Sequence, residues 1–283
     1  MTSRLGIKKT YKLFIGGKFP RTESGRFIEF ADGDGEFLSN VSWGSKKDLR
    51  NAIVAARSAQ AGWAGASAYL KGQILYRIAE VLDGRSGQFV DELVAQGSSE
   101  KAAAKEVSEA IDLLVHYAGW SDKYSSLFST VNPVASSHFN FSLPEPMGVV
   151  GVIAPNRSGL LGLVSVLAPA IVGGNTVALL ASEKFPLTAI SFAEVLATSD
   201  VPNGVVNILT GKREELLIPF GSHMDVNAVV LCSNEKADIK TMELEAAENL
   251  KRIVKQADRV LAASPYHILD LQETKTTWHP IGV

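Results

Sequence analysis

The sequence predicts an α/β fold in which helices flank a parallel sheet. From residue 148 onward, short apolar stretches of strand character alternate with helical stretches. The stretch GVVGVIAPNRSGLLG gives the pattern, since an apolar strand and a polar turn precede the start of an apolar helix. Such alternation is typical of right-handed βαβ units and a parallel sheet. The 283 residues suffice for one large domain or two modest ones.

The first half of the chain is expected to be mostly helical after two short strands within residues 11–30, which surround Gly-Gly and Ser-Gly turns. Ser45 and Asp48 have the spacing of a capping box, so a helix is expected from there to Trp63. Apolar residues at helical spacing predict three further helices, over residues 69–82, 89–95 and 98–127.

The second half is expected to contain the parallel sheet. Strands are predicted over residues 137–143, 149–154, 176–180, 205–209 and 227–232. Helices are predicted over residues 160–172, 188–197 and 238–263. The uncharged stretch 159–173 is too short to cross a bilayer, and Asn156 and Arg157 precede it closely. A helix that is apolar on all sides is expected to be buried between layers instead.

Composition excludes several classes of function. The net charge of −2 and the pI near 6.2 provide no basic surface for nucleic acid. The single cysteine, Cys232, cannot form an internal disulfide and fits a reducing compartment. No apolar stretch follows Met1–Leu5, so no secretory signal is expected. These features predict a cytoplasmic protein that binds neither nucleic acid nor membrane.

Several long segments resemble the aldehyde dehydrogenase superfamily. EPMGVVGVIAP, LAPAIVGGNTVALLASEKFPLTA and VPNGVVNILTG, within residues 145–211, resemble its cofactor-binding half. LFIGGKF and AIVAARSAQAGW upstream, and HMDVNAVVLCS and ENLKRIV downstream, follow in the family's order. LDLQETKTTWHPIGV, residues 269–283, resembles the carboxy-terminal strand of a full-length member.

The resemblance implies an aldehyde-dehydrogenase-type, Rossmann-like α/β fold with a small β oligomerisation arm. A dinucleotide-binding-like domain is expected over residues 1–130 and 148–263, and the arm over residues 131–147 and 264–283. The family's catalytic domain would lie between ENLKRIV and the carboxy-terminal strand. Only a few residues separate these segments here, so the catalytic domain is expected to be absent.

The family's catalytic groups are expected to be lost as well. Arg157 stands where the motif P-W-N-F-P has its oxyanion-holding asparagine, and Gln256 stands where L-E-L-G-G has its general-base glutamate. An amide cannot accept a proton in the useful pH range. The nucleophilic cysteine belongs to the missing domain, and Cys232 aligns with a threonine at the end of a core strand, so a structural role is expected for it. The resemblance thus predicts a pseudoenzyme without catalytic residues.

Cofactor contacts are expected to be vestigial. The family's K-P-S-E corresponds to Leu180–Glu183, so Ser182 and Glu183 remain but the ribose-gripping lysine does not. Ser233 replaces the glycine of F-T-G-S that lets phosphate approach the backbone. No cofactor is expected, although residual NAD(P) binding stays open. The five histidines show no metal-ligand spacing, so no metal is expected.

The arm points to a protein partner. Its terminal strand keeps the family's interface segment, Glu273, Thr274, Lys275, Thr276, Thr277 and Trp278. The leading hypothesis is a non-catalytic subunit that docks onto a full-length aldehyde dehydrogenase as a hetero-oligomer, similar to the inactive half of double-module aldehyde dehydrogenases. A nucleotide-binding module is the alternative. A working NAD(P)-dependent aldehyde oxidoreductase ranks last.

Overall fold

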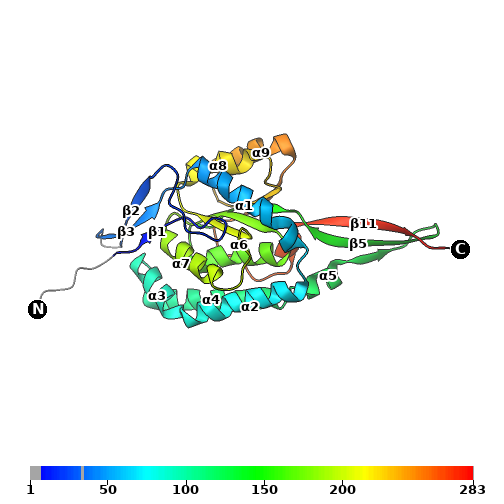
Figure 1. The fold of residues 1–283 in the computed structure, drawn as a ribbon, viewed down its shortest axis with the longest axis horizontal. Coiled ribbons are helices and arrows are strands. Elements are labelled where there is room, and N and C mark those ends of the chain that lie inside the picture. Colours follow the sequence, from blue (N-terminus) through cyan, green and yellow to red (C-terminus); the bar gives the residue numbers. More distant parts are fainter. Residues whose placement is uncertain (1–7, 33–34, 283) are drawn as a thin grey trace, which may run out of the picture.

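A computed structural model describes residues 8–32 and 35–282 and shows an α/β body with a projecting β arm (Figure 1). The strands are β1 (Thr10–Tyr11), β2 (Phe27–Ala31), β3 (Phe37–Ser42), β4 (Thr130–Asn132), β5 (His138–Pro146), β6 (Val149–Ile153), β7 (Thr176–Leu180), β8 (Val206–Leu209), β9 (Ala228–Cys232), β10 (Arg252–Gln256) and β11 (Gln272–Pro280). The α-helices are α1 (Lys46–Ala64), α2 (Ala68–Gly84), α3 (Ser86–Ala95), α4 (Glu100–Ala118), α5 (Lys123–Phe128), α6 (Leu160–Val172), α7 (Pro186–Ala197), α8 (Arg213–Ser222), α9 (Lys236–Ala246) and α10 (Tyr266–Leu269).

The body is built on a five-stranded parallel sheet in the order β10-β9-β6-β7-β8, which confirms the predicted fold class. Helices α1, α8 and α9 cover one face, while α2, α4, α6 and α7 cover the other (Figure 1). Every residue of β6, β7, β8 and β9 is therefore buried. Helix α6 is buried on all sides, as its uniformly apolar sequence predicts.

A second, three-stranded sheet in the order β1-β3-β2 lies at the end of the body opposite the arm (Figure 1). Strand pairing within residues 11–30 is shorter than predicted, because only an isolated bridge, Ile15 with Lys18, forms around the Gly-Gly turn. Strand β3 has no counterpart in the prediction. The predicted helix over residues 98–127 is two helices, because Gly119 caps α4 and a turn precedes α5.

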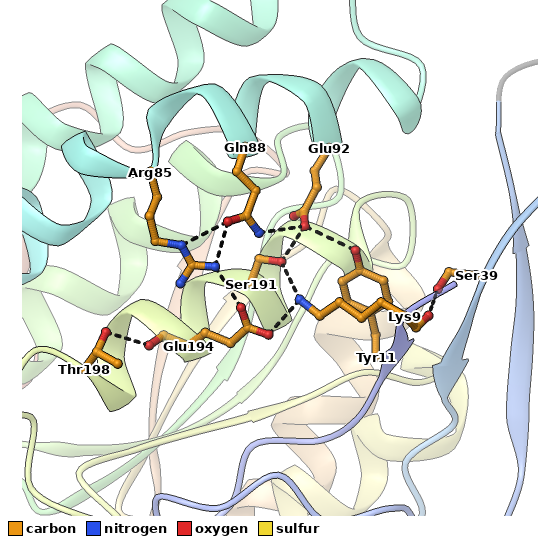
Figure 2. A network of polar contacts seen from close by, with 9 residues as sticks. All are labelled: Lys9, Tyr11, Ser39, Arg85, Gln88, Glu92, Ser191, Glu194 and Thr198. Atoms are coloured by element: carbon orange, nitrogen blue, oxygen red, sulfur yellow. Dashed lines mark hydrogen bonds and ion pairs between the residues drawn. The ribbon is translucent and has the colours of Figure 1, made fainter. Parts of the chain in front are cut away.

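A polar network anchors β1 to α3 and α7 (Figure 2). The Tyr11 hydroxyl and the Ser191 hydroxyl both donate to Glu92 Oε1, at 3.2 and 2.6 Å. Lys9 Nζ lies 2.7 Å from the Glu194 carboxylate. Burial raises the pKa of Tyr11, and the Glu92 charge beside it acts in the same direction, so the phenol stays a hydrogen-bond donor. We assign this network a structural role.

The predicted helix over residues 238–263 is confirmed up to Ala246 and wrong beyond it. Helix α9 ends at Ala246, Leu250 takes the left-handed conformation with φ 52°, and the chain then forms β10. The physical reason is the edge of β9, whose backbone groups pair with β10 from Arg252 to Gln256. Gln256 therefore lies at the end of a strand and not within a helix.

Lys251, just before β10, is only 7% exposed, and its Nζ donates to the His223 carbonyl and to Asn249 Oδ1, both at 3.0 Å. Desolvation lowers its pKa from 10.5 to about 8. Between these values the unfolded chain binds a proton that the folded chain does not, so folding stability rises with pH.

We expect the free energy of unfolding of the native chain, measured against Lys251→Met, to rise by about 1–3 kcal/mol between about pH 7 and pH 10.5. At high pH the Lys251 amine is neutral, so the folded chain no longer bears the cost of burying its charge. Methionine is uncharged and never bears that cost. Urea unfolding of both proteins across this range measures the difference. A difference that stays constant with pH would contradict the shifted pKa.

The arm is an antiparallel sheet in the order β11-β5-β4 that projects from the body (Figure 1). Strands β5 and β11 pair over nine residues, from Gln272 opposite Pro146 to Pro280 opposite His138. Residues 257–271, including α10, connect β10 to β11. Among the helices of the described ranges, none combines the length and the apolar character needed to cross a membrane.

Candidate functional site

The carboxyl ends of β6, β7, β9 and β10 meet at one edge of the sheet because these strands are parallel. Ligands of open α/β sheets bind in the crevice outside this edge. The loop from Ala154 to Gly159 follows β6 there, Ser182 and Glu183 follow β7, and Gln256 ends β10. The structure thus gathers the predicted body-site residues at one edge.

Arg157 lies on the outside of this crevice. Its side chain is 71% exposed, and its Nε is 3.9 Å from Asp258 Oδ2, which is a loose contact. Asp258 instead holds the loop backbone, since Asn156 N–H donates to its Oδ1 at 2.6 Å. The Asn156 side chain is also engaged, because its Oδ1 accepts from Glu183 N–H at 2.9 Å. The polar groups of this loop therefore hold the loop itself in place.

Glu183 is occupied by its own chain. Arg213 N–H donates to Glu183 Oε1 at 2.8 Å, and Lys212 Nζ lies 3.2 Å from Oε2. Ser182 Oγ donates to the Asn156 carbonyl at 3.3 Å and accepts from the backbone of Lys184. Each carboxylate oxygen of Glu183 thus already has one partner within the chain.

The Arg213 side chain crosses the crevice. Its Nη2 donates to the Ala154 carbonyl at 3.0 Å, at the end of β6, and its Nη1 is 3.6 Å from Asp238 Oδ2. The Arg213 side chain is only 14% exposed, so this is a partly buried ion pair. Ser233 donates to the same Asp238 oxygen at 2.7 Å. Arg213 and Asp238 thus link the end of β6 to Ser233, just after β9, by internal polar contacts.

The amino terminus of α6 is capped by a carboxylate from α4. Glu106 Oε1 accepts from the backbone N–H groups of Leu160 and Leu161, at 2.8 and 3.1 Å, and from Ser158 Oγ at 2.8 Å. Such N–H groups, at the end of a βα turn, are where nucleotide phosphates bind in α/β folds. Here a residue of the chain already supplies the anion. The amino terminus of α6 therefore already holds an anionic group of the chain.

Gln256 and Cys232 are neighbours in register at the ends of β10 and β9. Cys232 is fully buried, and burial raises the pKa of its thiol to about 12, with Arg213 acting in the opposite direction and Asp258 adding to the rise. A thiol in this environment carries almost no thiolate near neutral pH.

We expect Cys232 in the folded protein to react with iodoacetamide about a thousandfold more slowly at about pH 8 than in the denatured chain. Mass spectrometry after timed quenching measures both rates. The denatured chain is its own control because it contains the same single thiol. Equal rates would mean an exposed, ionised thiol and would reopen the possibility of a nucleophilic role.

Sequence reasoning missed the groups that fill the crevice, namely Lys212, Arg213, Asp238 and Glu106. The basic pair directly after a predicted strand could have drawn notice, but Glu106 sits in the middle of a helix and carries no signal. Within the described residues, no cluster of three or more His, Cys, Asp or Glu side chains could hold a metal ion.

The predicted interface segment, Glu273 to Trp278, lies on β11 at one edge of the arm sheet. Glu273 pairs with Arg252 at 2.9 Å, and Lys275 pairs with Glu145 at 3.1 Å. The Thr276 and Ser142 hydroxyls lie 2.8 Å apart. Trp278 is 57% exposed. Glu273 thus ties the segment to β10 of the body, and Lys275 and Thr276 tie it to β5. The outer backbone edge of β11 has no neighbouring strand among the described residues.

Comparison with known proteins matches the aldehyde dehydrogenase family model to residues 19–257. Aldehyde dehydrogenase, cytosolic 1, of Elephantulus edwardii is 31% identical over 249 residues, covering 86% of this chain and 49% of the relative. Cytosolic 10-formyltetrahydrofolate dehydrogenase of Mus musculus is 28% identical over 256 residues, covering 88% of this chain and 28% of the relative. The chain therefore spans half or less of the length of these relatives.

Solved structures match the same part of the chain. HpcC from Thermus thermophilus superposes with a TM-score of 0.82 at 27% identity, over 88% of this chain and 48% of that one. The NAD⁺ complex of an aldehyde dehydrogenase from Bacillus cereus superposes with a TM-score of 0.82 at 25% identity, over 87% of this chain and 50% of that one.

Proposed function

This chain belongs to the aldehyde dehydrogenase family, and from that premise we propose that it is a non-catalytic subunit lacking the family's catalytic domain. It docks through its arm onto a full-length aldehyde dehydrogenase and forms a hetero-oligomer with it. We propose a cytoplasmic location as well, which is supported by relatives described as cytosolic.

The occupied crevice supports the absence of catalysis. Glu183 is held by Lys212 and the Arg213 backbone, and the amino terminus of α6 is held by Glu106. An anion at the amino terminus of α6 would have to displace the Glu106 carboxylate from backbone N–H groups. Because bonds from donors to charged groups contribute about 1.5–3 kcal/mol, that displacement is costly. Arg157 and Gln256, at the positions of the family's asparagine and glutamate, supply neither an oxyanion amide nor a base.

The edge of β11 carries the docking proposal. Pro144 and Pro146 have no N–H, and they lie opposite Thr274 and Gln272. In an antiparallel ladder, directly opposite residues alternate between pairs that exchange both hydrogen bonds and pairs that exchange none. The two prolines therefore lie in pairs that exchange no hydrogen bonds. The alternation continues along β11, so the N–H groups of Thr274, Thr276 and Trp278 point away from β5. An added strand finds these donors on the outer edge.

Affinity purification of the tagged chain from its host, followed by native mass determination, tests this function. Recovery of a full-length aldehyde dehydrogenase subunit, identified by its peptides and present in fixed stoichiometry, is the expected result. A homogeneous species made only of this chain would exclude the hetero-oligomer.

A nucleotide-binding module is the second candidate, because a matched relative was solved with NAD⁺. Calorimetric titration with NAD⁺, NADH and the NADP forms tests it. We expect no heat at millimolar ligand. If the native chain binds a nucleotide and Glu183→Gln does not, the result would favour a nucleotide-binding module over a subunit that binds no nucleotide.

An aldehyde oxidoreductase is the least supported candidate, since Cys232 is the only thiol and is buried. Assays of the purified chain and of Cys232→Ser with NAD(P)⁺ and aldehydes test it. Turnover that is lost in Cys232→Ser would support this candidate, and turnover that survives would exclude the thiol as nucleophile.

A further inference from the structure

A cavity of about 590 Å³ lies between α1 and α8, on the sheet face opposite α6. Leu49 and Pro219 form apolar parts of its wall, and Met224, which is 66% exposed, adds a flexible apolar surface. Polar residues complete the lining: Lys46, Lys47, Arg50, Ser222 and His223. The cavity combines an apolar wall with a cationic rim.

The cations of this rim are poorly compensated. Lys47 pairs with Glu23, but Lys46 and Arg50 make no hydrogen bond or ion pair with any described residue. Like charges four residues apart on a helix repel one another. Lys46 is also in the first turn of α1, where the helix dipole disfavours a cation. Local helix energetics thus disfavour this pair of cations, and a bound anion would relieve their repulsion.

His223 lines the same cavity, and the charges of Lys46 and Arg50 act on its imidazole. Its burial lowers the pKa of the imidazole, Asp225 raises it, and the cations Lys251, Arg50 and Lys46 lower it further. The ring is therefore mostly neutral near neutral pH.

We propose that this cavity binds a small organic anion, with an apolar body against Leu49, Pro219 and Met224 and its acid group between Lys46 and Arg50. Carboxylates and phosphate monoesters share the required chemistry. This site lies on the body, away from β11, so its success or failure does not depend on the docking proposal.

Methionine methyl NMR tests the site with a matched set of probes: 2-naphthoate, 2-naphthyl phosphate and the neutral 2-naphthamide. The chain has four methionines, of which Met224 lines the cavity and Met147 adjoins the arm and serves as the reference. We expect an anionic probe to shift the Met224 resonance at micromolar to millimolar concentration while Met147 stays unmoved. The tighter of the two anions identifies the acid group.

Two variants separate charge from simple apolar contact. The double variant Lys46→Ala, Arg50→Ala is expected to weaken anion binding about tenfold. Lys101→Ala is the matched control, because Lys101 is also in the first turn of a helix, α4, on the other face of the sheet. Equal binding of the neutral amide, an unmoved Met224 resonance, or full binding by the double variant would each overturn the proposal.

Discussion

Replacing Trp63 with alanine is expected to lower the free energy of unfolding by about 3–5 kcal/mol. Trp63 is 1% exposed near the end of α1, and its Nε1 donates to the Ile171 carbonyl near the end of α6 at 2.9 Å. It therefore joins the two helices on opposite faces of the sheet. The Ile171 carbonyl also accepts from Gly174 N–H, so the cost comes mainly from the cavity and not from an unpaired oxygen.

Urea unfolding followed by circular dichroism measures this loss. The slope of the free energy of unfolding against urea concentration is expected to be unchanged. Trp63→Phe is the matched control, because it keeps much of the apolar volume but loses the hydrogen bond. We expect it to cost about 1–2 kcal/mol. If the alanine variant lost less than the phenylalanine variant, the packing role of the indole would be refuted.

The sequence predicts the fold best where glycine, asparagine or proline residues mark the ends of helices and strands. Helix α6 and strand β7 begin and end where the sequence predicts, because glycine precedes α6 and two glycines and an asparagine separate it from β7. The strand β10 was mistaken for helix because no glycine or proline separates it from α9. The chain reverses instead at Leu250, whose left-handed conformation is unusual for a leucine. Pairing with β9, a tertiary effect, decides the outcome.

The candidate site was predictable in position but not in its contacts. Strand ends at a parallel-sheet edge are readable from the pattern, so Arg157, Ser182 and Glu183 could be placed together. The residues that hold the loop after β6 come from distant segments, since Asn156 N–H donates to Asp258 and Leu160 N–H donates to Glu106. Spacing along the sequence does not predict such pairs. Asp258 follows β10, which lies in the same sheet as β6, and Glu106 is on α4, which packs against α6.

The arm offers the sharpest test of the proposed function, and Thr276→Pro is expected to weaken binding to the proposed aldehyde dehydrogenase partner about 100-fold, or about 2.7 kcal/mol. Thr276 lies opposite Ser142 in the middle of β11, and its N–H points to the outer edge by the alternation that Pro144 and Pro146 impose. Proline removes this donor and places its ring against an incoming strand, while the bonds from β11 to β5 stay in place.

Thr276→Val is the matched control, because it keeps the backbone N–H and the branched shape but loses the hydroxyl contact with Ser142. Titration of the tagged variants with purified partner, read by interferometry, measures both affinities. Binding by the valine variant is expected to stay within about threefold of native. Loss in both variants would assign docking to the threonine side chain, and full binding by Thr276→Pro would rule out strand addition at β11, because the edge would then be dispensable.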